Sequence, residues 1–150
     1  MSKEEMEDGI FEAIKKYCDA GLEEMDKGNL KSAAKQFNSA WKIVPDPKEK
    51  WDASSWIIGA IGDVCFHLED WDNVKKSFEY AIVGLGGLGE PFLHLRLGQA
   101  HLELNNKKAA KDELARALMG GGPEIFEEDD PKYFEFITEF MDPPEGQDSW

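Results

Sequence analysis

The chain has 150 residues and a formal net charge of −14, with 41% hydrophobic and 32% charged residues. This length is enough for one domain with a hydrophobic core, and the composition is that of a soluble globular protein. There is no run of eighteen apolar residues, and the acidic N-terminus has the pattern of neither a signal peptide nor a transit peptide. We therefore expect a cytoplasmic protein that does not enter a membrane. The two cysteines, Cys18 and Cys65, lack metal or redox spacing and are expected to be free thiols.

The acidic residues gather at the two ends of the chain. Residues 1–12 carry a net charge of −4 and residues 124–150 carry −9, whereas residues 13–123 are nearly neutral at −1. Nucleic acids and anionic membranes attract basic patches, so this distribution argues against both as partners. It is compatible with a basic protein partner, and equally with acidic ends that only keep the protein soluble.

The first two expected helices are joined by a short turn. A capping box, Ser2 with Glu5, opens a helix that extends to about residue 27. Gly28-Asn29 stops this helix, and a second helix follows over residues 30–44.

A third helix is expected over residues 46–68. Asp46 is a suitable N-cap, Pro47 suits the first helical position, and Glu49 completes a second capping box. A fourth helix is expected over residues 71–83.

The second half of the chain predicts three more helices. A glycine-rich loop over residues 84–89 precedes a helical hairpin formed by residues 91–104 and 107–119. A last short helix is expected over residues 131–141, followed by a frayed tail over residues 143–150. Seven helices without a strand indicate an all-α fold, and we expect a single domain over residues 1–142.

A small–large–small pattern recurs three times in register. In each set a glycine is followed nineteen residues later by an alanine, with a bulky apolar residue three positions before that alanine. The three sets are Gly21, Phe37 and Ala40; Gly62, Phe78 and Ala81; and Gly98, Leu114 and Ala117. Small residues allow two helices to approach closely while the large residue fills the space beside them, so the pattern predicts a repeated helix pair.

The three sets resemble the tetratricopeptide repeat (TPR), which has small residues at three positions and an aromatic residue at a fourth. The repeats cover about residues 14–47, 55–88 and 91–124, and Val74 and Leu114 depart mildly from the family pattern. The resemblance implies a right-handed helical solenoid of three helix pairs, with the last short helix as its C-terminal cap. A docking role for that last helix is the alternative.

In a TPR-like solenoid the inner faces of the first helices contact the partner. The residues expected at this surface are Leu22, Met25, Asp26, Trp56, Asp63, Phe66, Phe92, Arg96, Gln99 and Glu103, to which we add the acidic run Glu127, Glu128, Asp129 and Asp130. Aromatic side chains anchor interfaces because they bury a large area at low entropic cost, and acidic side chains select basic partners. For Trp56 and Phe92, packing against a neighbouring helix pair is an equal alternative.

No motif indicates catalysis, a cofactor or a metal. The segment Gly84–Gly89 fits the glycine spacing of a dinucleotide site, but it lies between two expected helices rather than after a strand, which favours a flexible loop. His94 and His101 share a helix face at packing positions, which favours core histidines over metal ligands. No serine or cysteine has a motif that supplies a base. We therefore expect no catalytic residue, no metal and no cofactor.

These observations predict a non-catalytic protein-binding module that is monomeric when free. In size, acidity and single repeat domain the chain resembles bacterial immunity proteins, which neutralise a cognate toxin domain. Many such toxins are basic, so an acidic inhibitor associates faster through electrostatic steering. The alternative is a cytosolic adaptor or co-chaperone that binds a peptide in its concave groove.

Overall fold

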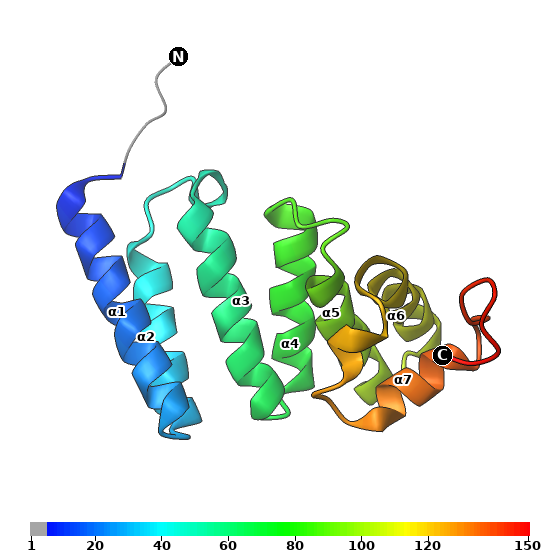
Figure 1. Ribbon diagram of the computed structural model, residues 1–150. Helices are drawn as coiled ribbons and strands as arrows, with labels where there is room; N and C mark the ends of the chain where they lie inside the picture. Colours follow the sequence, from blue (N-terminus) through cyan, green and yellow to red (C-terminus); the bar gives the residue numbers. More distant parts are fainter. Residues whose placement is uncertain (1–5) are drawn as a thin grey trace, which may run out of the picture. The chain divides into compact units, whose positions relative to one another are not determined.

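The computed structural model describes residues 6–150 (Figure 1), so the capping box expected at Ser2 and Glu5 lies outside the described residues. The described part contains seven α-helices and no strand, which confirms the predicted all-α class. None of its helices combines the length and apolar character needed to cross a bilayer. The chain divides into two compact units, Met1–Asp70 (unit 1) and Trp71–Trp150 (unit 2). The single domain over residues 1–142 stays a prediction.

Unit 1 contains three α-helices. They are α1 (Asp8–Asp26), α2 (Leu30–Ile43) and α3 (Asp52–His67). A tight turn joins α1 to α2, and Gly28 adopts a φ of +80° there, a conformation that glycine reaches without steric cost. α1 packs along α2, and α2 also packs against α3 (Figure 1).

Apolar side chains from all three helices form the core of unit 1. Ile14 and Cys18 of α1 pack with Ala40 and Val44 at the end of α2 and with Ile57 of α3. A second cluster, Ala33, Phe37 and Val64, lies between α2 and α3. α1 therefore buries one face against its neighbours and leaves the rest of its surface to solvent.

The start of α3 differs from the sequence prediction. The helix begins at Asp52 rather than at Asp46, after a 3-10 turn over Lys48–Lys50. The preceding segment instead closes the end of α2, because Lys48 Nζ donates to the carbonyl oxygens of Trp41 at 2.8 Å and Val44 at 2.7 Å. A cation at a helix C-terminus satisfies carbonyls that have no partner within the helix.

Unit 2 contains four α-helices. They are α4 (Trp71–Glu79), α5 (Pro91–Glu103), α6 (Lys107–Gly121) and α7 (Pro131–Thr138). A π-helical turn over Tyr80–Gly84 extends α4, and a 3-10 turn over Pro123–Phe126 precedes α7. α5 and α6 form a hairpin in which Asn106 caps α6 by accepting a hydrogen bond from the Ala109 amide at 3.3 Å.

α7 closes the core of unit 2. Its side chains Tyr133 and Ile137 are buried with Leu95 of α5, Leu114 of α6 and Phe126. Tyr133 and Ile137 are thus covered, whereas Phe140, just beyond the end of α7, is 48% exposed; the role of α7 as the cap of a solenoid stays a prediction. The tail over residues 143–150, predicted to be frayed, returns to the unit instead. Trp150 Nε1 donates to the Met141 carbonyl oxygen at 3.1 Å, and the Trp150 ring packs edge-on against Phe134.

Two of the three small–large sets form the close contacts expected of them. A Cβ atom added at Gly21 would lie 2.5 Å from the Phe37 ring, and one added at Gly98 would lie 2.6 Å from Leu114 Cγ. Both distances are shorter than a van der Waals contact, so a side chain at either glycine would force the paired helices apart. The members of the second set are divided between the two units.

We predict that Gly21→Ala destabilises the protein by up to about 2 kcal/mol. Overpacking against Phe37 costs about 1–3 kcal/mol and outweighs the gain of about 1 kcal/mol in helix propensity. Gly59→Ala in α3 is the matched control, because a Cβ atom there meets nothing within 4 Å. It should stabilise by about 0.5–1 kcal/mol. Equilibrium urea unfolding measures both, and shifts of the same sign would contradict the proposed contact.

Candidate protein-binding site

An open apolar pocket lies in unit 1 between α1 and the beginning of α3. Its volume is about 250 Å³. The residues that line it are Phe11, Ile14, Lys15, Cys18, Asp19 and Leu22 of α1, with Ala53, Trp56 and Ile57 of α3. The α1 residues recur at helical spacing, so a single face of that helix forms one wall of the pocket.

The pocket has a buried base and an exposed apolar rim. Ile14, Cys18 and Ile57 belong to the core of unit 1 and form the base. The rim residues Phe11, Leu22 and Trp56 are 50%, 43% and 46% exposed. Isolated apolar residues are common on protein surfaces, but three large ones around one pocket form a continuous apolar patch of the kind that binds another molecule.

Trp56 is held in place although it is half exposed. Its ring lies edge-on to the buried Phe37 ring, with 5.9 Å between the ring centroids. An aromatic side chain fixed in this way loses little conformational entropy when a partner covers it. Trp56 therefore packs on the core with one part of its ring and leaves the other part accessible, so both alternatives for this residue stay open.

The structure brings together two of the predicted partner-binding residues in unit 1. Leu22 and Trp56 line the pocket. Met25 packs on the cluster around Phe37, and Phe66 is partly buried. Asp26 is exposed outside the pocket, and Asp63 lies 3.8 Å from the His67 ring.

Sequence reasoning missed Phe11, Ile14, Ala53 and Ile57 as pocket residues. The first repeat was counted from residue 14, which left Phe11 outside the expected surface. The signal was present, because Phe11 precedes Cys18 by seven residues and Leu22 by eleven, and these spacings place all three on one face of α1.

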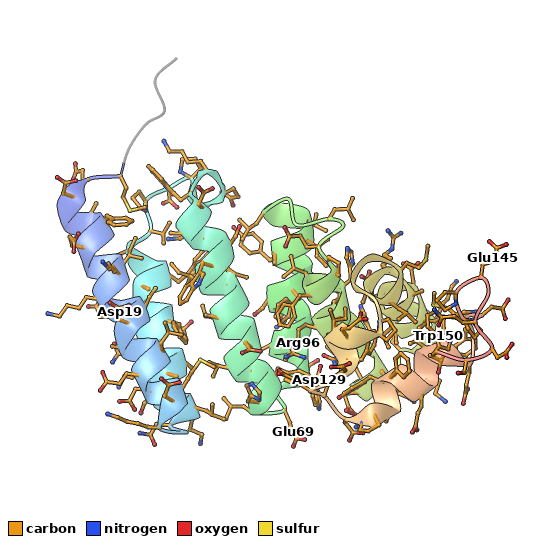
Figure 2. The ribbon with its side chains drawn as sticks, in the orientation of Figure 1. Asp19, Glu69, Arg96, Asp129, Glu145 and Trp150 are labelled. Carbon is orange, nitrogen blue, oxygen red and sulfur yellow. The ribbon has the colours of Figure 1, made fainter. Side chains whose placement is uncertain are left out.

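In unit 2 the predicted partner-binding residues contact one another. Arg96 Nη1 donates to Gln99 Oε1 and to Asp129 Oδ2, both at 2.9 Å, and Gln99 Nε2 donates to the same Asp129 oxygen at 2.8 Å. Figure 2 shows Arg96 and Asp129 directed toward each other. Gln99 is 0% exposed, so this part of α5 is not the open surface that the sequence predicted. A buried guanidinium requires such partners, and the chain supplies them itself.

The remaining acidic residues of unit 2 divide into structural and exposed groups. Glu103 accepts hydrogen bonds from Lys132 Nζ at 2.8 Å and from the Tyr133 hydroxyl at 3.0 Å. Asp130 caps α7, where its side chain accepts from the Lys132 amide at 2.9 Å. Glu127 and Glu128 are exposed, which leaves them accessible to a partner.

Phe92 and Tyr133 also contribute to this internal arrangement. Phe92 is half exposed, and its ring lies edge-on to the Phe78 ring. The Arg96 guanidinium lies over the Phe92 ring, 4.7 Å from its centroid. Burial and the hydrogen bond to Glu103 raise the pKa of Tyr133. The phenol therefore remains a neutral donor throughout the physiological range.

The histidines of α5 lie in the core of unit 2, as expected from their spacing. His94 Nε2 accepts a hydrogen bond from the Gly89 amide at 3.0 Å, which places the ring proton on Nδ1, 2.5 Å from Glu113 Oε2. The described residues include no group of histidine, cysteine and carboxylate side chains that could hold a metal ion. Gly89 thus ends a loop that contacts α5 directly.

The two cysteines are free thiols, as expected. Burial raises the pKa of both, with a further contribution from Asp19 at Cys18 and from Asp70 at Cys65. A thiol with a raised pKa is a poor nucleophile at neutral pH.

A comparison with protein-family models finds none that matches this chain, and a comparison with curated proteins finds no match either. Functional inference therefore depends on the geometry and charge of the site.

We predict that Asp129→Ala destabilises the protein by about 3–5 kcal/mol, because it leaves the buried Arg96 guanidinium and the Gln99 amide without their shared acceptor. Glu128→Ala, an exposed change one residue away, should shift the free energy of unfolding by less than about 0.5 kcal/mol. Urea unfolding of both variants measures the difference, and equal effects would contradict the structural role of Asp129.

We also predict that acid weakens unit 2 through His101. Burial is the largest cause that lowers the pKa of this histidine; Glu79 and Glu113 raise it and Lys75 lowers it further. Because the folded-state pKa lies below the unfolded value of about 6.5, the unfolded chain binds more protons in acid. The stabilising effect is present above about pH 6.5 and is lost as the pH falls through the folded-state pKa.

The test compares urea unfolding at neutral and mildly acidic pH. His101→Gln should show a weaker loss of stability in acid than the natural chain. His67→Gln, at an exposed histidine, should retain the full loss. An unchanged pH dependence in His101→Gln would contradict this account.

Proposed function

We propose that this protein is a non-catalytic protein-binding module that holds an apolar part of its partner in the α1–α3 pocket. The observation that carries the proposal is the rim formed by Phe11, Leu22 and Trp56, three large apolar side chains left half exposed around a buried base. Residues of this type supply most of the free energy of association at protein interfaces.

We further propose that the chain is built on TPR-like repeats. The close contacts at Gly21 and Gly98 and the helical hairpins of both units support this. In such repeats α1 and α3 are first helices, whose inner faces bind partners. The corresponding face of α5 is covered by the C-terminal segment through Asp129, which binds Arg96, and Tyr133, which binds Glu103, so we assign binding mainly to unit 1.

The volume of the pocket supports a protein partner rather than a small-molecule ligand. Small-molecule sites usually enclose about 300–1,000 Å³, whereas a cavity of about 150 Å³ accommodates benzene. At about 250 Å³, this pocket matches a single large apolar side chain. Such a side chain is what a partner protein presents to an anchor pocket.

The charge distribution favours a toxin-neutralising immunity protein as the biological role. Residues 124–150 carry a net charge of −9, and Glu127 and Glu128 remain exposed within this segment. An acidic surface accelerates association with a basic toxin domain. An adaptor that binds a peptide is the second candidate, favoured by the single-side-chain size of the pocket.

We predict that Trp56→Ala weakens binding about tenfold or more, mainly by a faster dissociation rate, because the fixed ring is lost from the pocket. A partner is first isolated from the source cells with the natural chain as bait, and its dissociation rate is then measured with purified proteins. Leu22→Ala should act in the same direction. Val83→Ala, at an 85% exposed residue of unit 2, is the control and should not change the rate.

The properties of this isolated partner distinguish the immunity role from the adaptor role. If it arrests growth when expressed alone and the natural chain restores growth, the immunity role is supported, whereas binding through one short peptide supports the adaptor. Equal dissociation rates for Trp56→Ala and the natural chain would refute the pocket as the binding site.

A further inference from the structure

We infer that the α1–α3 pocket receives a basic amphipathic helix, with one large apolar side chain in the pocket and lysine or arginine side chains along α1. This inference rests on the proposed function and names the chemical class of the partner.

An acidic stripe runs along α1 directly beside the pocket. It consists of Asp8, Glu12, Asp19, Glu23 and Asp26, all exposed. At 100° per residue these side chains fall within an arc of about 60°, next to the arc of Phe11, Cys18 and Leu22. Asp19 belongs to both features, since it lines the pocket and lies within the stripe. Two basic residues flank the stripe: Lys15 lies between the two arcs, four residues from Asp19, and Lys16 lies about 20° beyond the other edge, four residues from Glu12.

The opposite wall of the pocket is uncharged, because α3 contributes only Ala53, Trp56 and Ile57 to it. α3 contains Asp52 and Asp63 but no lysine or arginine, while α1 contains six acids and two lysines. A partner that lies along α1 therefore meets net negative charge beside the pocket, and α3 has no basic side chain to offset it. A second copy of this chain docked through the same face would place like charges together, and an acidic partner would do the same.

The stripe is unfavourable for the free protein. Asp8 and Glu12, and likewise Asp19 and Glu23, are like charges four residues apart on one helix. Glu23, Glu24 and Asp26 lie in the last turn of α1, where the helix dipole disfavours acids and where no basic residue is present. Lys27 follows as the C-cap and pairs with Glu23 at 3.3 Å, which offsets part of the repulsion. A basic partner would relieve the rest.

The distance spanned by the pocket wall along α1 indicates how long the contacting helix of the partner should be. Phe11 and Leu22 are eleven residues apart, which corresponds to about 16 Å along the axis of α1, or about three turns of a second helix. An amphipathic helix places apolar side chains at spacings of three, four and seven residues, so it can fill the pocket with one of them and cover the rim with others.

Three synthetic helical peptides of 15 residues test the inference with the full chain. The first carries leucines at one helical face and lysines elsewhere, the second has glutamates in place of the lysines, and the third keeps the lysines but replaces the leucines with serines. Titration calorimetry gives affinities, and NMR resolves the indole signal of Trp56, assigned by its loss in Trp56→Ala.

The first peptide should bind, shift the Trp56 signal and weaken about tenfold between low and physiological salt, because the charges involved are exposed. The other two peptides should bind at least about tenfold more weakly. The double variant Asp19→Asn with Asp26→Asn should bind the first peptide about tenfold more weakly while its melting temperature rises. Asp142→Asn with Asp148→Asn, an equal charge change in the exposed tail, is the control and should leave the affinity nearly unchanged.

Each contrary result overturns a different statement. Equal binding of the lysine and glutamate peptides, or unchanged affinity in the α1 double variant, refutes the basic partner but leaves the pocket as a protein-binding site. Binding that leaves the Trp56 signal unmoved refutes the pocket as the site of the helix. If no peptide binds while the isolated partner still depends on Trp56, the helical class is wrong and the proposed function stands. If neither the peptides nor the isolated partner depend on Trp56 for binding, both the helical class of partner and the proposed function of the pocket are refuted.

Discussion

At Gly21 and at Gly98 one helix of a hairpin has no side chain, and a large side chain of the partner helix, Phe37 or Leu114, occupies the space. This close approach fixes how each hairpin is rotated about its axis. In unit 1 it directs Gly21 toward α2, and helical periodicity then places Phe11, Cys18 and Leu22 on a neighbouring face beside α3. The pocket is thus a consequence of the same contact that packs the hairpin.

The first helices of the two hairpins differ in the chemistry of the corresponding face. In α5 it carries Arg96, Gln99 and Glu103, which are polar groups that cannot be buried without partners, and the C-terminal segment supplies them through Asp129, Lys132 and Tyr133. In α1 the face is apolar at its centre and acidic at its edge, and among residues 6–70 no segment covers Leu22 or Trp56 fully. The α5 face is thus covered by the chain itself, whereas the α1 face stays open, and this contrast is why we propose the α1 face as the binding surface.

Sequence periodicity predicted the helices well where local signals decided them. The hairpin turns at Gly28 and Asn105, the start of α5 at Pro91 and the capping of α7 by Asp130 all follow from residues close in sequence. The start of α3 was wrong because Lys48 reaches back to the carbonyls of α2, a contact that competes with a local N-cap at Asp46. The contacts of the C-terminal tail could not be predicted for a related reason, because Trp150 is held by Met141 and Phe134, which lie earlier in the chain.

The candidate site could be predicted only in part. Leu22 and Trp56 were identified because both are large apolar residues on expected inner faces. Arg96, Gln99 and Glu103 were also placed on an expected inner face, yet their partners Asp129 and Tyr133 lie about thirty residues further along the chain. Contacts at such separation leave no local pattern in one sequence, so periodicity could not distinguish a face that binds a partner from one that the chain covers itself.

The placement of the acidic residues bears on whether they serve only solubility. Acids in the tail, such as Asp142, Glu145 and Asp148, are exposed and lie outside any helix, so they raise solubility without weakening a helix. Acids in the last turn of α1 oppose the helix dipole, and solubility does not require them there. Acids that weaken the end of their own helix while bordering an apolar pocket are compatible with the basic partner proposed above, because binding would offset the repulsion that the free protein carries.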